Sequence, residues 1–238
     1  MKVFLDTGDV EAVHAAVQTG LVEGVTTNPS LIAKTDRNLL DVLGGMCALV
    51  NGPVSAEVMA ESAEKMRREA CAIASIAPNI VVKIPMTPEG LRIVPLLEKD
   101  GIRTNVTMVF SATQAWLAMK SGASFVSIVL SRLDAVGNDS AQLVSDTMLI
   151  KRNYGFRSEI IGGSLKTQNH VLCCLRAGVD IATIPAPLFS QLFNHPLTDL
   201  GLETFRRDWE SASDSARSLR NLETGLPRPK QVEETGVR

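Results

Sequence analysis

The chain has 238 residues, of which 45% are hydrophobic and only 4% are aromatic. Its formal net charge is −2 and its pI is about 6.0, which excludes the basic surface of a protein that binds nucleic acid or a membrane. A small ligand that is recognised locally is therefore the expected partner. We find neither a signal peptide nor an apolar run long enough to cross a bilayer, and we expect a cytoplasmic protein.

The cysteines and histidines form no recognisable ligand pattern. None of the four cysteines belongs to a Cys-x-x-Cys pair, and the three histidines are scattered along the chain. Neither a disulfide framework nor a zinc site is indicated by this spacing. We therefore expect reduced cysteines and no bound metal.

Short segments rich in branched aliphatic residues alternate with amphipathic segments. The predicted strands are 3–7, 24–30, 54–59, 80–86, 104–110, 125–130, 159–163 and 180–185. Helices are expected to start at Gly8-Asp9, to cover 39–50, 61–76 and 88–99, to run from a Ser111 cap to 120, and finally to start at Thr198-Asp199. The pattern is typical of repeated strand-helix-strand units, which give a parallel sheet.

Eight evenly spaced units favour an α/β fold, namely a single (β/α)8 barrel. A barrel of this length commonly forms one domain. The alternative is an open doubly wound sheet, which is less favoured because no Gly-x-Gly-x-x-Gly motif follows any strand.

An additional helix is expected after the eighth strand. It carries Leu202, Phe205 and Trp209 at helical spacing, a stripe that commonly covers the chain's own core. We expect the barrel domain and this helix to cover residues 1–210. Residues 211–238 are polar and are predicted to form a mobile C-terminal tail.

Lys83 stands among branched aliphatic residues near the end of the fourth predicted strand. A buried lysine is costly unless it is paired or loses its charge. At the carboxyl end of a barrel strand, a desolvated lysine is a candidate nucleophile, because burial favours the free amine. The alternative is a structural lysine that extends to the barrel mouth or joins an ion pair.

Polar residues end most of the predicted strands, and closure of the barrel would bring them to one mouth. They are Asp6, Asn28, Glu57, Lys83, Asn105, Thr107, Ser127 and Ser164. A lysine nucleophile requires a proton acceptor and donors that handle a carbinolamine, which carboxylates and a hydroxyl supply. Any one of these residues is explained by an ordinary strand-end hydrogen bond, but the whole set indicates a functional site.

Two basic residues, Arg132 and Lys166, follow the sixth and seventh strands. Barrel enzymes often bind phosphate near their late strands, and both side chains bind phosphate well. The neighbouring Gly-Gly-Ser at 162–164 favours a phosphate site over a solvated surface pair.

Several motifs occur together in uninterrupted order. They are Asp-Thr at 6–7, Val-Thr-Thr-Asn-Pro-Ser at 25–30, Val-Lys-Ile-Pro-Met-Thr at 82–87, Thr-Asn-Val-Thr at 104–107 with Val-Phe-Ser at 109–111, and His-Pro-Leu-Thr-Asp at 195–199. Over about residues 2–210, the chain resembles the small transaldolase family, which includes the fructose-6-phosphate aldolases. The resemblance implies a (β/α)8 barrel, a homo-oligomer that is usually a decamer of two pentameric rings, and no metal or organic cofactor.

Roles for the polar residues follow from their motif positions. The resemblance implies that Lys83 forms a Schiff base with a ketose donor, and that Asp6 takes the proton during carbon–carbon cleavage. It also implies that Glu57 and Thr107 order the catalytic water. The implied binding residues are Asn28 and Asn105 for donor hydroxyls, Ser127 for the dihydroxyacetone unit, and Arg132, Ser164 and Lys166 for the phosphate.

The details of the match favour one branch of the family. Glu57 and Asn105 resemble the transaldolases, since the aldolase branch typically has glutamine and threonine there. At 127–132 the chain has Ser-Ile-Val-Leu-Ser-Arg in place of the usual Ser-Pro-Phe-Val-Gly-Arg. Val129 therefore stands where transaldolases have phenylalanine and aldolases have tyrosine. Lys166 replaces the arginine usual in transaldolases, while the aldolases have a lysine there too.

We therefore expect a transaldolase that moves a dihydroxyacetone unit from a ketose phosphate to an aldose phosphate. The acceptor is expected to be longer than usual because Val129 is small, which would suit a specialised biosynthetic role. One alternative is an aldolase that releases free dihydroxyacetone. Another is a barrel without catalysis that only binds a sugar phosphate.

Overall fold

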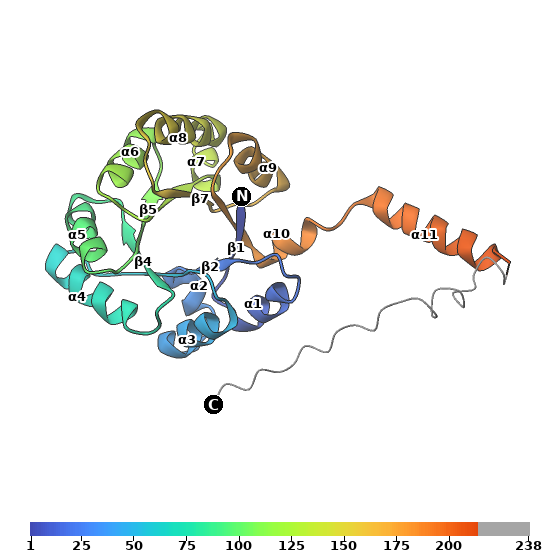
Figure 1. Cartoon of the computed structure of the whole chain (residues 1–238), viewed down its shortest axis with the longest axis horizontal. Helices are drawn as coiled ribbons and strands as arrows, with labels where there is room; N and C mark the ends of the chain where they lie inside the picture. Colours follow the sequence, from blue (N-terminus) through green and yellow to red (C-terminus); the bar gives the residue numbers. More distant parts are fainter. Residues whose placement is uncertain (214–238) are drawn as a thin grey trace, which may run out of the picture. The chain divides into compact units, whose positions relative to one another are not determined.

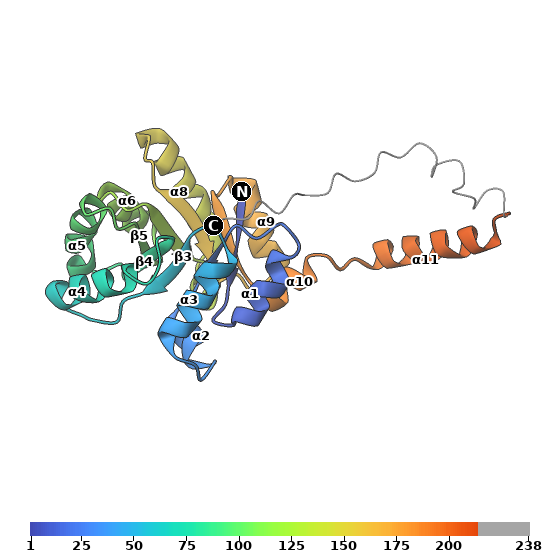
Figure 2. The same ribbon diagram turned by 60° about the horizontal axis from the view of Figure 1, so that its bottom comes forward.

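A closed barrel of eight parallel strands forms the centre of the computed structural model, which describes residues 1–213 (Figures 1 and 2). The strands are β1 (Lys2–Asp6), β2 (Gly24–Thr26), β3 (Val54–Glu57), β4 (Ile80–Pro85), β5 (Thr104–Val109), β6 (Phe125–Val129), β7 (Glu159–Gly163) and β8 (Ile181–Pro185). Each strand pairs with the next in sequence, and β8 pairs with β1. The predicted (β/α)8 barrel is confirmed, and the open doubly wound sheet is wrong.

Helices surround the barrel, and Figure 1 shows the longer ones as an outer ring around the strands, with some of the short ones closer in. They are α1 (Val10–Val17), α2 (Pro29–Ala33), α3 (Leu39–Leu49), α4 (Ala63–Ala74), α5 (Pro88–Lys99), α6 (Ala112–Lys120), α7 (Ser131–Asp134), α8 (Ser140–Tyr154), α9 (Gln168–Ala177) and α10 (Ala186–Gln191). The apolar faces of the longer helices pack inward, whereas the short α2 and α7 contain no buried residue. In α5, for example, Ile93, Val94 and Leu97 are buried. This packing closes the outer core between strands and helices.

Side-chain caps fix the starts of several helices next to the strand ends. Thr87 accepts a hydrogen bond from the backbone N–H of Gly90, and Ser111 accepts one from that of Gln114. Each cap satisfies a donor that the first helical turn leaves without a partner. The predicted start of α5 at Pro88 and the predicted Ser111 cap of α6 are confirmed.

Several predicted boundaries differ from the structure by two residues or more, among them the ends of the third strand at Glu57 and of the helix at Ala74. Two of the differences have a clear physical reason. The second strand, predicted to reach residue 30, ends at Thr26, because Asn28 caps α2 and Pro29 occupies its first turn. The last helix, predicted from Thr198, begins two residues earlier, because the Nδ1 atom of His195 accepts a hydrogen bond from the Leu197 N–H and caps the helix there.

Five apolar side chains fill the amino-terminal end of the barrel interior. This floor cluster consists of Phe4, Val81, Phe125, Ile161 and Ile181, each at most 4% exposed. Side chains alternate between the faces of a strand, so the residue two places further along points into the same interior, one layer nearer the carboxyl end. In β1, β4 and β6 that residue is Asp6, Lys83 or Ser127. Gly24 leaves room for the cluster, since a Cβ atom there would lie 2.7 Å from the Phe4 ring.

The chain divides into two compact units, Met1–Leu192 and a second that begins at Phe193. The second unit contains α11 (Pro196–Ser211), in which no residue is buried and the side chains of the predicted stripe are more than half exposed. Most of the predicted tail 211–238 lies outside the described residues. Within residues 1–213, no helix is long and apolar enough to cross a membrane, and no group of three or more His, Cys, Asp or Glu side chains is placed to hold a metal ion.

Candidate active site

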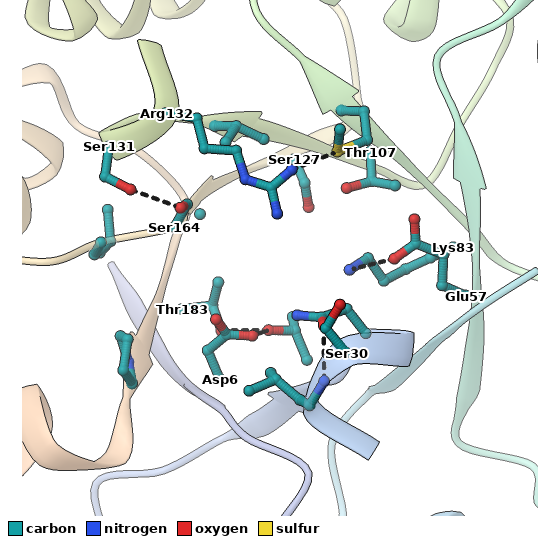
Figure 3. Close-up of a pocket in the computed structure, with 18 of the residues that line it drawn as sticks. Asp6, Ser30, Glu57, Lys83, Thr107, Ser127, Ser131, Arg132, Ser164 and Thr183 are labelled. Carbon is teal, nitrogen blue, oxygen red and sulfur yellow. Dashed lines mark hydrogen bonds and ion pairs between the residues drawn. The ribbon is translucent and has the colours of Figure 1, made fainter. Parts of the chain in front are cut away.

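A cavity of about 490 Å³ lies at the carboxyl ends of the barrel strands (Figure 3). Active sites of barrel enzymes occupy this end. Of the ten residues predicted for the site, nine line the cavity: Asp6, Asn28, Glu57, Lys83, Thr107, Ser127, Arg132, Ser164 and Lys166. The tenth, Asn105, is fully buried beside it. The fold therefore brings residues from distant parts of the chain to one mouth.

Lys83 occupies the middle of a polar row that crosses three neighbouring strands. Strand β4 places it opposite Glu57 of β3 and opposite Asn105 of β5, which confirms the predicted neighbours. The Lys83 Nζ atom lies 3.2 Å from Glu57 Oε2 and donates a hydrogen bond of 2.9 Å to the Thr27 carbonyl. The Lys83 and Glu57 side chains are only 10% and 16% exposed, so water screens their attraction weakly.

This geometry suits proton transfer between the amine and the carboxylate. A separation of 3.2 Å between Lys83 Nζ and Glu57 Oε2 is close to hydrogen-bond distance. Glu57 can take a proton from the amine and return one to a departing hydroxyl. Figure 3 shows both side chains pointing into the cavity, with Thr107 on the same side. The Lys83 amine therefore lies in the cavity beside the Glu57 carboxylate and does not extend out to solvent.

Asp6 contributes a second carboxylate from β1. Burial raises the pKa of Asp6, while the hydrogen bond from Thr26 and the positive charges of Lys83 and Lys166 oppose this shift without cancelling it. A carboxyl group with a raised pKa accepts and releases a proton more readily near neutral pH. Asp6 is therefore suited to act as an acid or base in the cavity.

Two threonines form a hydrogen-bonded chain that ends on Asp6, and the sequence analysis did not find them. Thr26 Oγ1 donates a hydrogen bond of 2.9 Å to Asp6 Oδ1, and the Oγ1 atoms of Thr26 and Thr183 are 2.6 Å apart. A hydroxyl has one proton, so Thr26 gives its own to Asp6 and accepts that of Thr183. Both threonines lie two places beyond an interior residue of the strand, namely Gly24 or Ile181. The alternation of the strands, applied to every strand, would have found them.

Asn105, the member of the polar row that does not line the cavity, contacts the cavity lining through its side chain. Ser127 Oγ donates to Asn105 Oδ1 at 2.8 Å, and Asn105 Nδ2 donates to Ser55 Oγ at 3.3 Å. These bonds orient Ser127, which does line the cavity. A direct contact between Asn105 and a donor hydroxyl stays a prediction. Asn28 caps α2 with its oxygen, and within residues 1–213 its amide N–H groups have no hydrogen-bond partner.

A basic end of the cavity faces the Lys83–Glu57 pair. Figure 3 shows Ser131 and Ser164 on the side opposite Glu57, with the Arg132 guanidinium between. The two serine Oγ atoms are 2.7 Å apart, so one hydroxyl donates to the other and one proton remains for a ligand. Lys166 lines the cavity as well. Two cations and two hydroxyls after the late strands are suited to a phosphate group.

Met108 is a further cavity residue that the sequence did not reveal. The register of β5 against β6 shifts between Val106 and Val109, and the backbone of Met108 is left-handed, with φ of 61°. Its sulfur lies 3.7 Å from Nη1 of Arg132. Left-handed backbone is strained for a non-glycine residue and is concentrated at functional sites. The shift therefore turns a thioether toward the basic end.

Comparisons with known proteins agree with this site. Residues 3–224 match the family model described as transaldolase/fructose-6-phosphate aldolase. A probable transaldolase of Methanococcus maripaludis is 52% identical over 211 residues, which cover 89% of this chain and 98% of the relative. Probable transaldolases of Clostridium tetani and Herpetosiphon aurantiacus are each 49% identical, over 89% and 91% of this chain and 99% and 98% of the relatives. This chain is therefore an enzyme of the transaldolase/fructose-6-phosphate aldolase family.

Proposed function

We propose that the enzyme transfers a dihydroxyacetone unit from a ketose phosphate to an aldose phosphate through a Schiff base on Lys83. The observation that carries the proposal is a lysine amine inside the cavity, 3.2 Å from the Glu57 carboxylate. A buried lysine with a nearby proton acceptor is suited to attack a carbonyl carbon.

The reaction uses the two carboxylates in separate steps. The neutral Lys83 amine attacks the donor ketone, and Glu57, with water ordered by Thr107, moves the protons that let the carbinolamine lose water. Asp6 then takes the proton of the donor hydroxyl next to the bond that breaks, and the aldose leaves. The enamine on Lys83 attacks the acceptor aldehyde, Asp6 returns the proton, and water releases the new ketose. Each step is an acid–base transfer within reach of a cavity side chain.

The basic end provides the proposed site for the substrate phosphate. Arg132, Ser164 and Lys166 supply charge and a hydroxyl at the end of the cavity away from Glu57. Arginine binds phosphate with two parallel N–H groups, and lysine adds a point charge. We propose that donor and acceptor phosphates both occupy this end, so that the reacting carbons lie near Lys83 and Asp6.

Turnover of fructose 6-phosphate, with and without an acceptor aldose phosphate, tests the proposed transfer. Formation of a new ketose phosphate that depends on the acceptor supports a transaldolase. Release of free dihydroxyacetone without an acceptor identifies the alternative, a fructose-6-phosphate aldolase. If neither reaction proceeds while the sugar phosphate still binds, the barrel either only binds this sugar phosphate or uses another donor, and the proposed transfer from fructose 6-phosphate is wrong.

Val129 is proposed to enlarge the acceptor side of the cavity that it lines. In the family that the chain resembles, this position is phenylalanine or tyrosine. Val129 therefore lacks both the volume of an aromatic ring and the tyrosine hydroxyl. We therefore expect ribose 5-phosphate to be used better than erythrose 4-phosphate, and Val129→Phe to reverse the preference. Size changes in an apolar pocket are worth about 1–3 kcal/mol per methylene, so the ratio of kcat/KM values should shift by about tenfold.

Two measurements decide the Val129 prediction. Both acceptors are assayed with wild type, Val129→Phe and the smaller change Val129→Ile, while borohydride labelling of Lys83 serves as a control that the first step is intact. A wild type that prefers erythrose 4-phosphate, with a ratio that Val129→Phe leaves unchanged, would contradict the enlarged pocket.

We also propose that the chain assembles into a pentamer or decamer in which α11 packs on a neighbouring subunit. The exposed Leu202, Phe205 and Trp209 and the family resemblance support this assembly. Replacing Phe205 and Trp209 together by alanine should lower the oligomeric mass in light scattering, because each buried aromatic contributes about 1.5–3 kcal/mol to an interface. The polar change Arg206→Ala on the same helix should leave the mass unaltered. A wild type that is a stable monomer would contradict the assembly.

A further inference from the structure

A histidine–aspartate pair lies directly behind the basic end of the cavity. His170 Nε2 is 2.8 Å from Asp134 Oδ2, although the two residues are 36 positions apart in the sequence. The His170 side chain is 16% exposed and that of Asp134 is 38% exposed. Neither residue lines the cavity among the described residues, so the pair has no direct access to a substrate there.

The hydrogen bonds of His170 define which nitrogen of the neutral imidazole carries the proton. The backbone N–H of Lys166 donates a hydrogen bond of 3.0 Å to His170 Nδ1. A ring nitrogen that accepts cannot carry a proton, so in the neutral ring the proton sits on Nε2 and is donated to Asp134. One imidazole therefore accepts on one side and donates on the other.

Asp134 extends the connection to a third element. Its Oδ1 atom accepts a hydrogen bond of 3.1 Å from the backbone N–H of Ser140, the first residue of α8. Burial raises the pKa of Asp134, but the hydrogen bonds from Ser140 and His170 outweigh this and leave the pKa below its usual value. The Asp134 carboxylate, which accepts the hydrogen bond from His170 Nε2, therefore stays ionised at neutral pH.

The pair joins the two segments that carry the basic residues of the cavity. Asp134 lies on the single turn of α7 that also holds Arg132, and the backbone bonded to His170 is that of Lys166. The hydroxyls of Ser131 and Ser164 make a second connection between the same two segments. Arg132 and Lys166 are thus spaced by a fixed set of polar contacts as well as by the strands.

We infer that His170 and Asp134 are positioning residues that hold Arg132 and Lys166 at the spacing required by a substrate phosphate. This inference rests on the proposed phosphate site. Charged side chains bind a ligand less tightly when the contacts that hold them in place are removed. The side chains must then be ordered during binding, and this ordering costs free energy. The pair therefore sets the affinity for the phosphorylated end of the sugar and leaves the chemistry at Lys83 unaffected.

The test compares phosphorylated and unphosphorylated donors. His170→Phe keeps the ring volume and removes both connections, so KM for fructose 6-phosphate should rise about tenfold, the factor that corresponds to about 1.4 kcal/mol. The inhibition constant of inorganic phosphate should rise in parallel. The rate constant kcat and the KM for unphosphorylated fructose should stay within about twofold of wild type, because neither depends on the phosphate contacts.

Two further variants separate the two connections of the ring. His170→Asn retains an acceptor near the position of Nδ1 but does not reach Asp134, whereas His170→Gln places its amide near the position of Nε2. If both hydrogen bonds of the ring contribute to positioning, each variant should raise KM for fructose 6-phosphate by less than His170→Phe does. Asp134→Asn combined with His170→Phe should be no worse than His170→Phe alone, since the interaction is already lost. The change His14→Asn, at an exposed histidine of α1, is the matched control.

Arg132→Gln serves as the reference for losing the phosphate site itself. If Arg132→Gln selectively weakens fructose 6-phosphate and inorganic phosphate while His170→Phe does not, the phosphate site stands and the role of His170 is overturned. An equal rise in KM for both donors in His170→Phe also overturns it, because that result indicates a general structural loss. If Arg132→Gln has no selective effect either, the phosphate site and the positioning role both fail.

Discussion

Replacing Lys83 by alanine is expected to reduce turnover by about four orders of magnitude or more, because the variant lacks the proposed covalent nucleophile. Lys83→Arg should be equally inactive. Its guanidinium is permanently charged and supplies no neutral amine to the ketone. The carboxylates Asp6 and Glu57 remain in both variants, so residual turnover would measure what the cavity achieves without an imine.

Borohydride trapping identifies the nucleophile directly. With fructose 6-phosphate and wild type, reduction should leave a three-carbon adduct on the peptide that contains Lys83, detected as a mass increase. Lys83→Ala should give no adduct, and Lys65→Ala, which removes an exposed lysine of α4, should label like wild type. An adduct on a different residue, or labelling that persists in Lys83→Ala, would contradict the assignment.

Asp6→Asn is expected to lower kcat by about 10²–10⁴-fold, the usual contribution of a general base. The amide is nearly the same shape and can still accept the hydrogen bond from Thr26. In the proposed mechanism imine formation uses Lys83 and Glu57, so it should continue, while cleavage of the carbon–carbon bond should become slow. Borohydride should therefore trap the whole phosphorylated ketose in this variant, in place of the three-carbon unit. A three-carbon adduct formed at the wild-type rate would show that another group takes the proton.

The same substitution should stabilise the fold at neutral pH. Burial raises the pKa of Asp6 in the folded state above its unfolded value, so the stability contributed by this group is present at low pH and is lost as the pH rises through the folded pKa. At neutral pH, burial of the ionised Asp6 carboxylate lowers the stability of the folded state. We therefore expect Asp6→Asn to raise the Tm there, a common trade-off at catalytic positions.

A pH series checks the sign of this effect. As the pH falls through the raised pKa, wild-type Asp6 becomes neutral and resembles asparagine, so the difference in Tm between the two proteins should shrink. The kcat of wild type should fall over the same range, because the base becomes protonated. Thr183→Val removes a hydroxyl from the same network without changing charge, and should give a Tm difference that does not vary with pH in this way. A stabilisation that grows in acid would contradict the assignment of the shift to Asp6.

The barrel and the central polar row were predictable because both follow from local patterns. Strands of branched aliphatics recur between helices, and adjacency of consecutive strands places Glu57 and Asn105 beside Lys83. Asn28 was assigned to a strand because Val-Thr-Thr favours extended backbone, whereas Asn-Pro begins a helix. Boundaries of this kind depend on one capping bond.

Other parts of the site depend on contacts that no local pattern records. Thr26 and Thr183 were overlooked because threonine is also an ordinary strand residue. Met108 faces the cavity only because the register of β5 shifts, and no glycine marks the shift. The contact of His170 with Asp134 joins helices that are brought together by the closed barrel. Such pairs become visible only when the three-dimensional arrangement is known.

The floor cluster determines how substrates, products and water enter and leave the cavity. Phe4, Val81, Phe125, Ile161 and Ile181 fill the barrel beneath the reacting groups and are almost fully buried. The donor sugar, the leaving aldose and water must then all pass through the opening at the carboxyl ends of the strands. During the lifetime of the proposed enamine, an acceptor bound at this opening would delay the entry of water. The ratio of transfer to release therefore depends on the fraction of active sites that hold an acceptor. Raising the acceptor concentration should decrease the release of free dihydroxyacetone in proportion to this fraction.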